Sequence, residues 1–313
     1  MRFTKSVVLA TTMLSSSMTL AYADVNVVAS IKPVHSLVSA VMDGVAKPTL
    51  LVEGAASPHT YSLKPSQAKQ LQEADIVFWM SHDLEVFLEN SIENIAQRAV
   101  SVPLIESHNL TKLSFREGGA FDAHGHDDHD DHDDKHDDHD ETDPHVWLDP
   151  QNAKALVHEI EEQLAKIDPE NAEVYEANAS IVMKKLDKLT NEIDVDLKPI
   201  RSRGYVVFHD AYQYFEKRFG ISAIGSITVS PEVMPGAERV RELQEKVREL
   251  DATCVFSEPQ FQPKLVATVT ENTNAGTGVL DPLGTSLEDS PELYFKLIRN
   301  MANSLKGCLM KTS

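Results

Sequence analysis

Residues 168–200, DPENAEVYEANASIVMKKLDKLTNEIDVDLKPI, predict one long helix in the middle of the chain. We expect Asp168 to cap its start, Pro169 to occupy the first helical position and Pro199 to end it. About 29 helical residues at about 1.5 Å each would span roughly 43 Å. A helix of that length can tie two parts of a protein together rigidly.

Strand-like and helix-like segments alternate on both sides of this helix. Before it, apolar runs predict strands at residues 25–30, 48–53, 75–81 and 99–105, with helical segments at 33–42 and 64–74 among them. After it, the predicted strands are 204–210, 221–227, 252–258 and 276–282, and the predicted helices are 211–219, 236–250, 264–273 and 291–307. Such alternation is typical of α/β folds, in which helices cover both faces of parallel sheets. We therefore expect two α/β lobes of parallel sheet with flanking helices, joined by the long helix.

Composition limits the possible partners of the chain. It has 313 residues, of which 42% are hydrophobic, so it can bury substantial cores. The formal charge is −20, but residues 122–143 alone hold twelve acidic residues and one lysine, so the excess is largely local. Binding nucleic acid requires a basic face, so nucleic acid is excluded as a partner.

The N-terminus has the features of an export signal. Arg2 and Lys5 precede a mildly apolar stretch, and the AYA of residues 21–23 fits the small-x-small cleavage rule. We expect a signal peptide over residues 1–23 and a mature chain that begins at Asp24; an apolar helix that stays attached is the alternative. No cysteine lies near the cleavage point and no later run approaches the roughly 20 apolar residues of a membrane span. The prediction is a soluble, periplasmic protein without a lipid anchor.

We divide the mature chain into an N-terminal lobe (24–167), the linking helix (168–199) and a C-terminal lobe (200–313). The only cysteines, Cys254 and Cys308, both fall in the C-terminal lobe. An even number of cysteines in an exported protein favours a disulfide, which would contribute about 4 kcal/mol in the chain-entropy model. Two buried free thiols are the alternative.

Residues 124–140, HGHDDHDDHDDKHDDHD, are the centre of a predicted mobile loop over about residues 118–143. No hydrophobic residue occurs between Gly125 and Thr142, so this segment cannot pack a core. Its imidazoles will bind Zn²⁺, but weakly, because the loop must be ordered on binding. We predict a secondary metal site that gathers or senses ions, with a solvated loop of no function as the alternative. Its histidines are His124, His126, His129, His132, His136 and His139.

Three other histidines are unusual in their context: two lie at or just after predicted strands, and one is flanked by prolines that fix the backbone. His59 occurs in EGAASPHTYSLKPS, His145 in DPHVWLDP and His209 in VVFHDAY, while Asp281 ends another strand in VLDPLG. In open α/β sheets ligands bind beyond the carboxyl ends of the strands, so these side chains can converge on one cleft. Three neutral imidazoles and a carboxylate suit tetrahedral Zn²⁺. The residues follow no short-range ligand motif, so ordinary structural histidines are the alternative.

Neighbouring residues are candidates for the surroundings of such a site. His82 and Glu258 both follow strands and could lie beside the ligands; a polar loop residue and a surface carboxylate are the alternatives. Trp79 and Trp147 are more typical of packing than of ligand contact. The sequence contains no HExxH pattern, which argues against the best-known class of zinc hydrolases.

Five ordered motifs, ASPHTYSLKPS, DPHVWLDP, VFHDAYQYF, FSEPQF and LDPLG, resemble those of the cluster A-I substrate-binding proteins of metal ABC transporters. The likeness extends from about Asp24 to the C-terminus and is greatest to zinc-type members. It implies two lobes joined by a rigid helix, with the metal held in the cleft between them. His59, His145 and His209 match the three histidine ligands of the family.

The resemblance leaves the fourth ligand open. Asp281 matches an aspartate that is a ligand in manganese-type relatives, whereas in zinc-type members water or a glutamate can complete the shell. One zinc-type relative uses a glutamate just before the first histidine, where this chain has Pro58, and the spacing of Glu53 does not match. Manganese-type relatives carry glutamate at the position of His209, so nitrogen here favours zinc over manganese. Copper and nickel would also bind imidazole strongly.

Together these features predict a carrier that captures periplasmic Zn²⁺ and delivers it to an ABC permease driven by its ATPase, both partners being implied by the resemblance. We expect it to be a monomer and not an enzyme. A manganese or other divalent-metal carrier, a secreted zinc hydrolase, and a periplasmic metal buffer or adhesin are the alternatives.

Overall fold

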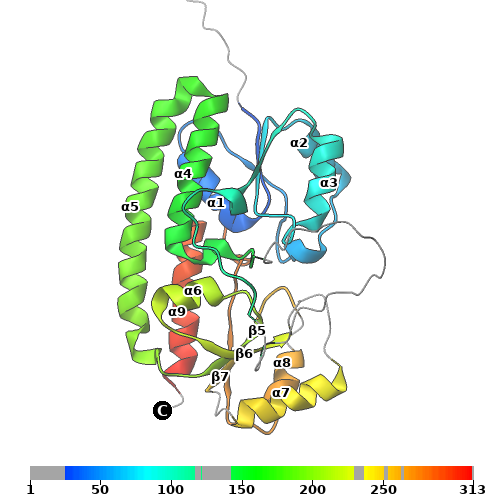
Figure 1. Ribbon diagram of the computed structural model, residues 1–313, viewed down its shortest axis with the longest axis vertical. Helices are drawn as coiled ribbons and strands as arrows, with labels where there is room; N and C mark the ends of the chain where they lie inside the picture. The colour runs from blue at the N-terminus through cyan, green and yellow to red at the C-terminus, as the bar shows by residue number, and fades with distance from the viewer. Residues whose placement is uncertain are drawn as a thin grey trace, which may run out of the picture.

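Two four-stranded parallel sheets organise the chain (Figure 1). The computed structural model describes residues 25–116, 121, 142–228, 236–249, 253–261 and 264–311. The first sheet has the order β2-β1-β3-β4 and consists of β1 (Val27–Ala29), β2 (Thr49–Leu50), β3 (Ile76–Trp79) and β4 (Val100–Pro103). The second has the order β6-β5-β7-β8 and consists of β5 (Tyr205–His209), β6 (Ala223–Thr228), β7 (Cys254–Ser257) and β8 (Gly276–Val279). Each predicted strand is present, which confirms the α/β fold of two lobes.

Helices connect the strands, because parallel neighbours require crossover connections. In the N-terminal lobe these are α1 (Lys32–Val41), α2 (Pro65–Gln72), α3 (Val86–Ile95) and α4 (Pro150–Ile167). The long helix α5 (Ala172–Leu197) follows, and then α6 (Gln213–Phe219), α7 (Ala237–Glu249), α8 (Lys264–Thr270) and α9 (Leu293–Leu309). Short 3-10 turns cover Pro58–Thr60, Leu104–Glu106, Val146–Leu148, Pro169–Asn171 and Lys198–Ile200. Within the described residues, no helix is both long and apolar enough to cross a membrane.

Each sheet is covered by helices on both faces. On one face of the first sheet, Val77 and Trp79 pack with Leu71 of α2 and Leu88 of α3 in a cluster of their own. On one face of the second sheet, Val206 and Phe208 pack with side chains of α7 and α8, including Leu243 and Val266. The opposite faces of both sheets share one large core with α1, α4, α5 and α9. The two lobes are therefore joined by a common core as well as by the chain.

The helix α5 runs along both lobes beside α4 and α9 (Figure 1). It buries a stripe at helical spacing, made of Tyr175, Ala179, Val182, Leu186, Leu189, Ile193 and Leu197. The predicted start of this helix is wrong by a few residues. Asp168 follows the last residue of α4 and precedes a 3-10 turn that begins at Pro169, and α5 itself begins at Ala172. The Asp168 carboxylate accepts a hydrogen bond from the Tyr175 hydroxyl instead of capping the helix backbone.

The predicted disulfide is present between Cys254 in β7 and Cys308 in α9, with Cα atoms 6.3 Å apart. It ties the closing helix to the start of a strand in the second sheet. The proposed signal peptide at residues 1–23 lies outside the described residues. So do residues 122–141, which contain all six histidines of the predicted loop. The lobe boundaries at 24–167, 168–199 and 200–313 stay a prediction.

Candidate metal centre

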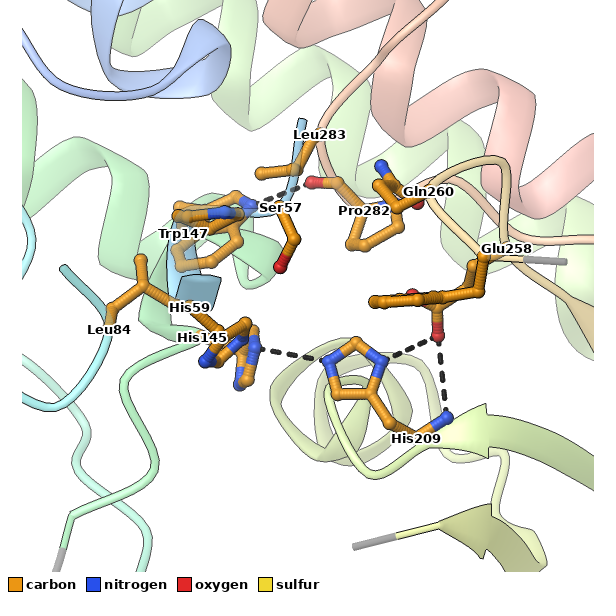
Figure 2. A pocket seen from close by; sticks show the side chains of 12 residues that line it. Ser57, His59, Leu84, His145, Trp147, His209, Glu258, Gln260, Pro282 and Leu283 are labelled. Carbon is orange, nitrogen blue, oxygen red and sulfur yellow. Dashed lines mark hydrogen bonds and ion pairs between the residues drawn. The ribbon is translucent and has the colours of Figure 1, made fainter. Parts of the chain in front are cut away.

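Three of the predicted ligands meet between the two lobes (Figure 2). His59 lies in the 3-10 turn that Pro58 begins, His145 immediately precedes the 3-10 turn Val146–Leu148, and His209 is the last residue of β5. One ligand nitrogen from each ring lies within 4.8 Å of the others. The Nε2 atoms of His145 and His209 are 3.4 Å apart. Two 3-10 turns and the end of β5 thus bring imidazoles from both lobes to one point.

Two buried carboxylates fix the orientation of two of these rings. The Asp143 Oδ1 atom lies 2.6 Å from His145 Nδ1, and Glu258 Oε1 lies 2.7 Å from His209 Nδ1. A carboxylate accepts, so each Nδ1 carries the proton and each Nε2 presents a lone pair to the pocket. This carboxylate–histidine arrangement is the usual support of metal-binding histidines. The sequence left open whether Glu258 lies beside the ligands or is a surface carboxylate, and the structure places it beside His209. Asp143, two positions before His145, was not predicted from the sequence to support a ligand.

The pKa values of His59 and His209 are shifted in opposite directions. Burial, together with the nearby imidazoles of His145 and His209, holds the pKa of His59 well below its usual value. Burial would also lower the pKa of His209, but the charge of Glu258 and its hydrogen bond raise that pKa above the ordinary value. His59 is therefore neutral and ready to bind a cation at neutral pH.

Asp281 is not a member of the cluster that the described residues form. Its Oδ1 accepts hydrogen bonds from the backbone N–H groups of Leu283 and Gly284, and its Oδ2 accepts one of 2.6 Å from the N–H of Thr285. The Gln260 amide also donates to Oδ1. The carboxylate thereby holds the turn that begins at Pro282, and this turn supplies one wall of the pocket.

The pocket around the three rings is narrow and mainly apolar. Its walls include Leu84, Trp147, Pro282 and Leu283 (Figure 2). Phe261 also lines it. The Trp147 indole N–H donates to the Pro282 carbonyl, so this ring both packs and joins the lobes. The free volume is about 10 Å³, enough for an ion or about one water molecule. Gln260 Oε1, in the same wall, is buried and has no hydrogen-bond partner among the described residues.

The remaining described histidines lie apart from this cluster. The side chain of His82 is more than half exposed and pairs with Glu89. His82 is therefore a polar loop residue and not a neighbour of the ligands. His35 is buried, with Nε2 3.1 Å from the carbonyl of Pro48. His108 and His158 are exposed.

Comparison with known proteins identifies the family. Residues 27–308 match the family model of ZnuA, described as zinc-uptake complex component A, periplasmic. The chain belongs to the ZnuA family. The ZnuA protein of Brucella suis, a high-affinity zinc uptake system protein, is 52% identical over 306 residues that cover 91% of this chain and 92% of that protein. The ZnuA protein of Yersinia pestis is 34% identical over 307 residues, which cover 95% and 96% of the two chains.

A solved structure shares the fold. The crystal structure of a ZnuA superposes with a TM-score of 0.73 at 24% identity and covers 90% of this chain and all of that one. The agreement extends to the two-lobe architecture that places the three histidines at the interface.

Proposed function

We propose that this chain captures Zn²⁺ in the periplasm with His59, His145 and His209 and delivers it to an ABC permease for import. The observation that carries the proposal is the meeting of three imidazole nitrogens within 4.8 Å in a pocket formed by both lobes. Its relatives in Brucella suis and Yersinia pestis are high-affinity zinc uptake proteins that align with it over more than nine tenths of each chain. Zinc is thus the cargo of the protein.

The ligand types select the ion. Imidazole nitrogen binds zinc well, while manganese prefers carboxylate and water oxygen. All three clustered ligands are imidazoles, so the described residues disfavour manganese. Copper and nickel also accept imidazole, so preference over these ions depends on geometry and supply.

For the fourth position we favour water over Asp281. The Asp281 oxygens already accept hydrogen bonds from Leu283, Gly284 and Thr285, and turning one toward an ion would break the turn. Gln260 Oε1, a buried acceptor in the pocket wall, offers a partner for a water bound to the ion. Such a water would also complete a tetrahedral shell with three protein nitrogens.

Binding fits this pocket better than hydrolysis does. A zinc hydrolase needs room for a substrate and a general base that can reach the water. The free volume of about 10 Å³ admits no organic substrate. The nearby carboxylates Asp143 and Glu258 are each bonded to a histidine Nδ1, where they orient ligands. We therefore propose a carrier without catalytic activity.

The partners and location follow from the family and the sequence. A periplasmic uptake component requires a membrane permease and an ATPase that powers it, and the export signal at residues 1–23 would place the chain in that compartment. The charge of −20 agrees with a partner other than nucleic acid.

Native mass spectrometry of the mature chain tests the proposal. Protein stripped with a chelator would be offered equal amounts of zinc, manganese, copper and nickel and then treated with a competing chelator. We expect one zinc ion per chain to remain. A chain that retains manganese in preference, or that retains no ion, would overturn the assignment; zinc-limited growth of cells without the gene then separates import from simple buffering.

A further inference from the structure

Asp143 connects the metal pocket to the opposite lobe. The residue is completely buried, and its two carboxylate oxygens have different tasks. Oδ1 accepts from the backbone N–H of His145 at 2.9 Å and lies 2.6 Å from the His145 ring nitrogen Nδ1. Oδ2 accepts a 2.6 Å hydrogen bond from the amide of Gln213. One side chain of the N-terminal lobe is thus held between a ligand and the C-terminal lobe.

Gln213 is placed to hold this carboxylate firmly. It is the first residue of α6, four positions after His209, and it is itself nearly buried. Its amide nitrogen also donates to the Ser114 carbonyl at 3.1 Å, so both of its hydrogens have acceptors in the N-terminal lobe. The next residue, Tyr214, donates its hydroxyl to the Asp143 carbonyl at 2.8 Å. The start of α6 therefore fixes both the backbone and the side chain of Asp143.

Another bond between the lobes provides a contrast. Arg218, in the last turn of α6, forms two 2.7 Å hydrogen bonds with the buried carboxylate of Asp149. Asp149 caps α4 through the Gln151 N–H, so the partners of its carboxylate are a helix start and Arg218, not a histidine of the cluster. Both bonds run from α6 to the segment at residues 143–149 of the N-terminal lobe, but only the Gln213–Asp143 bond leads to a ligand.

We infer that Gln213 is a positioning residue that acts through Asp143 to hold the His145 imidazole in its zinc-binding orientation, and so couples the docking of the two lobes to zinc affinity. The inference rests on the proposed zinc site. An imidazole held by one carboxylate oxygen keeps its direction only while the carboxylate itself cannot rotate. The donor on Oδ2 prevents that rotation. A displacement of α6 relative to residues 142–145 therefore turns His145 and loosens the ion.

Two substitutions of Gln213 remove the donor in different ways. Gln213→Ala deletes the amide, and Gln213→Glu keeps the shape but places an acceptor opposite Oδ2. Supporting partners of metal-bound histidines typically change affinity by about 10–100-fold, and we expect a loss in that range for both variants, with faster zinc dissociation. The matched control is Arg218→Gln, which breaks the other interlobe bond and should leave affinity within about twofold, given that it reaches no ligand.

Chelator competition and stopped-flow zinc release on all three variants and the wild type decide the matter, with apo melting temperatures recorded alongside. If the role of Gln213 is purely structural, the Gln213 variants and Arg218→Gln should all have lower melting temperatures, and the Gln213 variants should show no selective loss of zinc affinity. If Gln213 acts through Asp143, then Gln213→Ala should add no further loss in an Asp143→Asn background. Additive losses, or Gln213 variants with wild-type affinity, would overturn the inference alone. A wild-type chain without a tight zinc would overturn the proposed function as well.

Discussion

The Nε2 atoms of His145 and His209 lie 3.4 Å apart, although 64 positions separate the two residues in the sequence. Two nitrogens bound to one zinc at about 2.0–2.1 Å, with a tetrahedral angle between them, would be about 3.3 Å apart. The observed spacing therefore suits an ion held by both rings with little movement of either. Because the rings come from different lobes, the site exists only when the lobes are assembled.

Removal of any one clustered histidine should abolish tight zinc binding. His59→Ala, His145→Ala and His209→Ala each leave two protein nitrogens, and we expect affinity to fall by more than the roughly 100-fold that supporting residues can cost. Calorimetry with chelator competition measures the loss. His82→Ala is the control, because that exposed ring pairs with Glu89 away from the cluster. Wild-type affinity in any of the three variants would refute the ligand assignment.

The fold was predictable because its signals are local. Strands covered on both faces appear as short apolar runs, such as residues 76–79 and 205–209, and no distant information is needed to find them. The start of α5 was not predictable in this way. Asp168 and Pro169 have the residue types of a helix start. The Asp168 carboxylate instead accepts a hydrogen bond from the Tyr175 hydroxyl, and the α-helix begins only at Ala172.

The candidate site was predictable only in part, for a related reason. His59 and His209 could be found because they lie at or just after strands, where ligands gather in α/β sheets, and His145 could be found by the prolines that flank it. The bond from Gln213 to Asp143 crosses the lobe interface and joins residues 70 positions apart, so no local pattern encodes it. The role of Asp281 depends on the turn at Leu283–Thr285, which the motif LDPLG does not reveal.

Asp281→Ala should reduce stability more than zinc affinity. The change removes the acceptor of three backbone N–H groups, each of which would lose a bond worth about 1 kcal/mol. With water in the fourth position the three imidazoles stay, so affinity should fall less than in any histidine variant. Urea denaturation of the apo protein and a zinc titration compare the two effects. A loss of affinity equal to that of His209→Ala would instead make Asp281 a ligand.

Glu85 should make stability depend on pH. Burial raises the pKa of this carboxyl from 4.5 to about 7, despite hydrogen bonds from Ser30, Ser81 and Met80. The folded chain then binds the proton more tightly than the unfolded chain does, so stability is highest below about pH 4.5 and falls as pH rises to about 7. We expect wild type to lose about 3 kcal/mol relative to Glu85→Gln over this range, with no further change above it.

Urea denaturation of the apo protein from pH 4.5 to 8 measures this difference. Glu53→Gln removes an exposed carboxylate of the same type and serves as the control. If wild type and Glu85→Gln show parallel pH profiles, the carboxyl of Glu85 is not the cause.

Loss of the disulfide should lower stability without touching the metal site. Cys254 pairs with Tyr205 at the start of β5, whereas His209 ends that strand about 13 Å away at the usual rise per residue. Replacing both cysteines with alanine opens a loop with a sequence separation of 54 and should cost about 4 kcal/mol in the chain-entropy model. Thiol labelling of denatured, unreduced wild type should find no free thiol. If the double alanine variant loses tight zinc, the second sheet is not rigid between the two ends of its strands.

Deletion of residues 124–140 should leave the tight zinc in place. The two sides of this segment are already joined: Ser114 and Thr142 form an antiparallel bridge, and the Asp143 N–H donates to the Leu113 carbonyl at 2.9 Å. The Gln213 amide fastens the same place to α6, so His145 keeps its support when the chain between is shortened. The deleted residues include no apolar side chain that could hold their six histidines in a fixed arrangement, and ordering them on binding reduces their affinity. Titration of intact and shortened chains against a strong chelator should therefore show one tight zinc in both and additional weak ions only in the intact chain; disappearance of the tight zinc with the segment would place the principal site there and not at His59, His145 and His209.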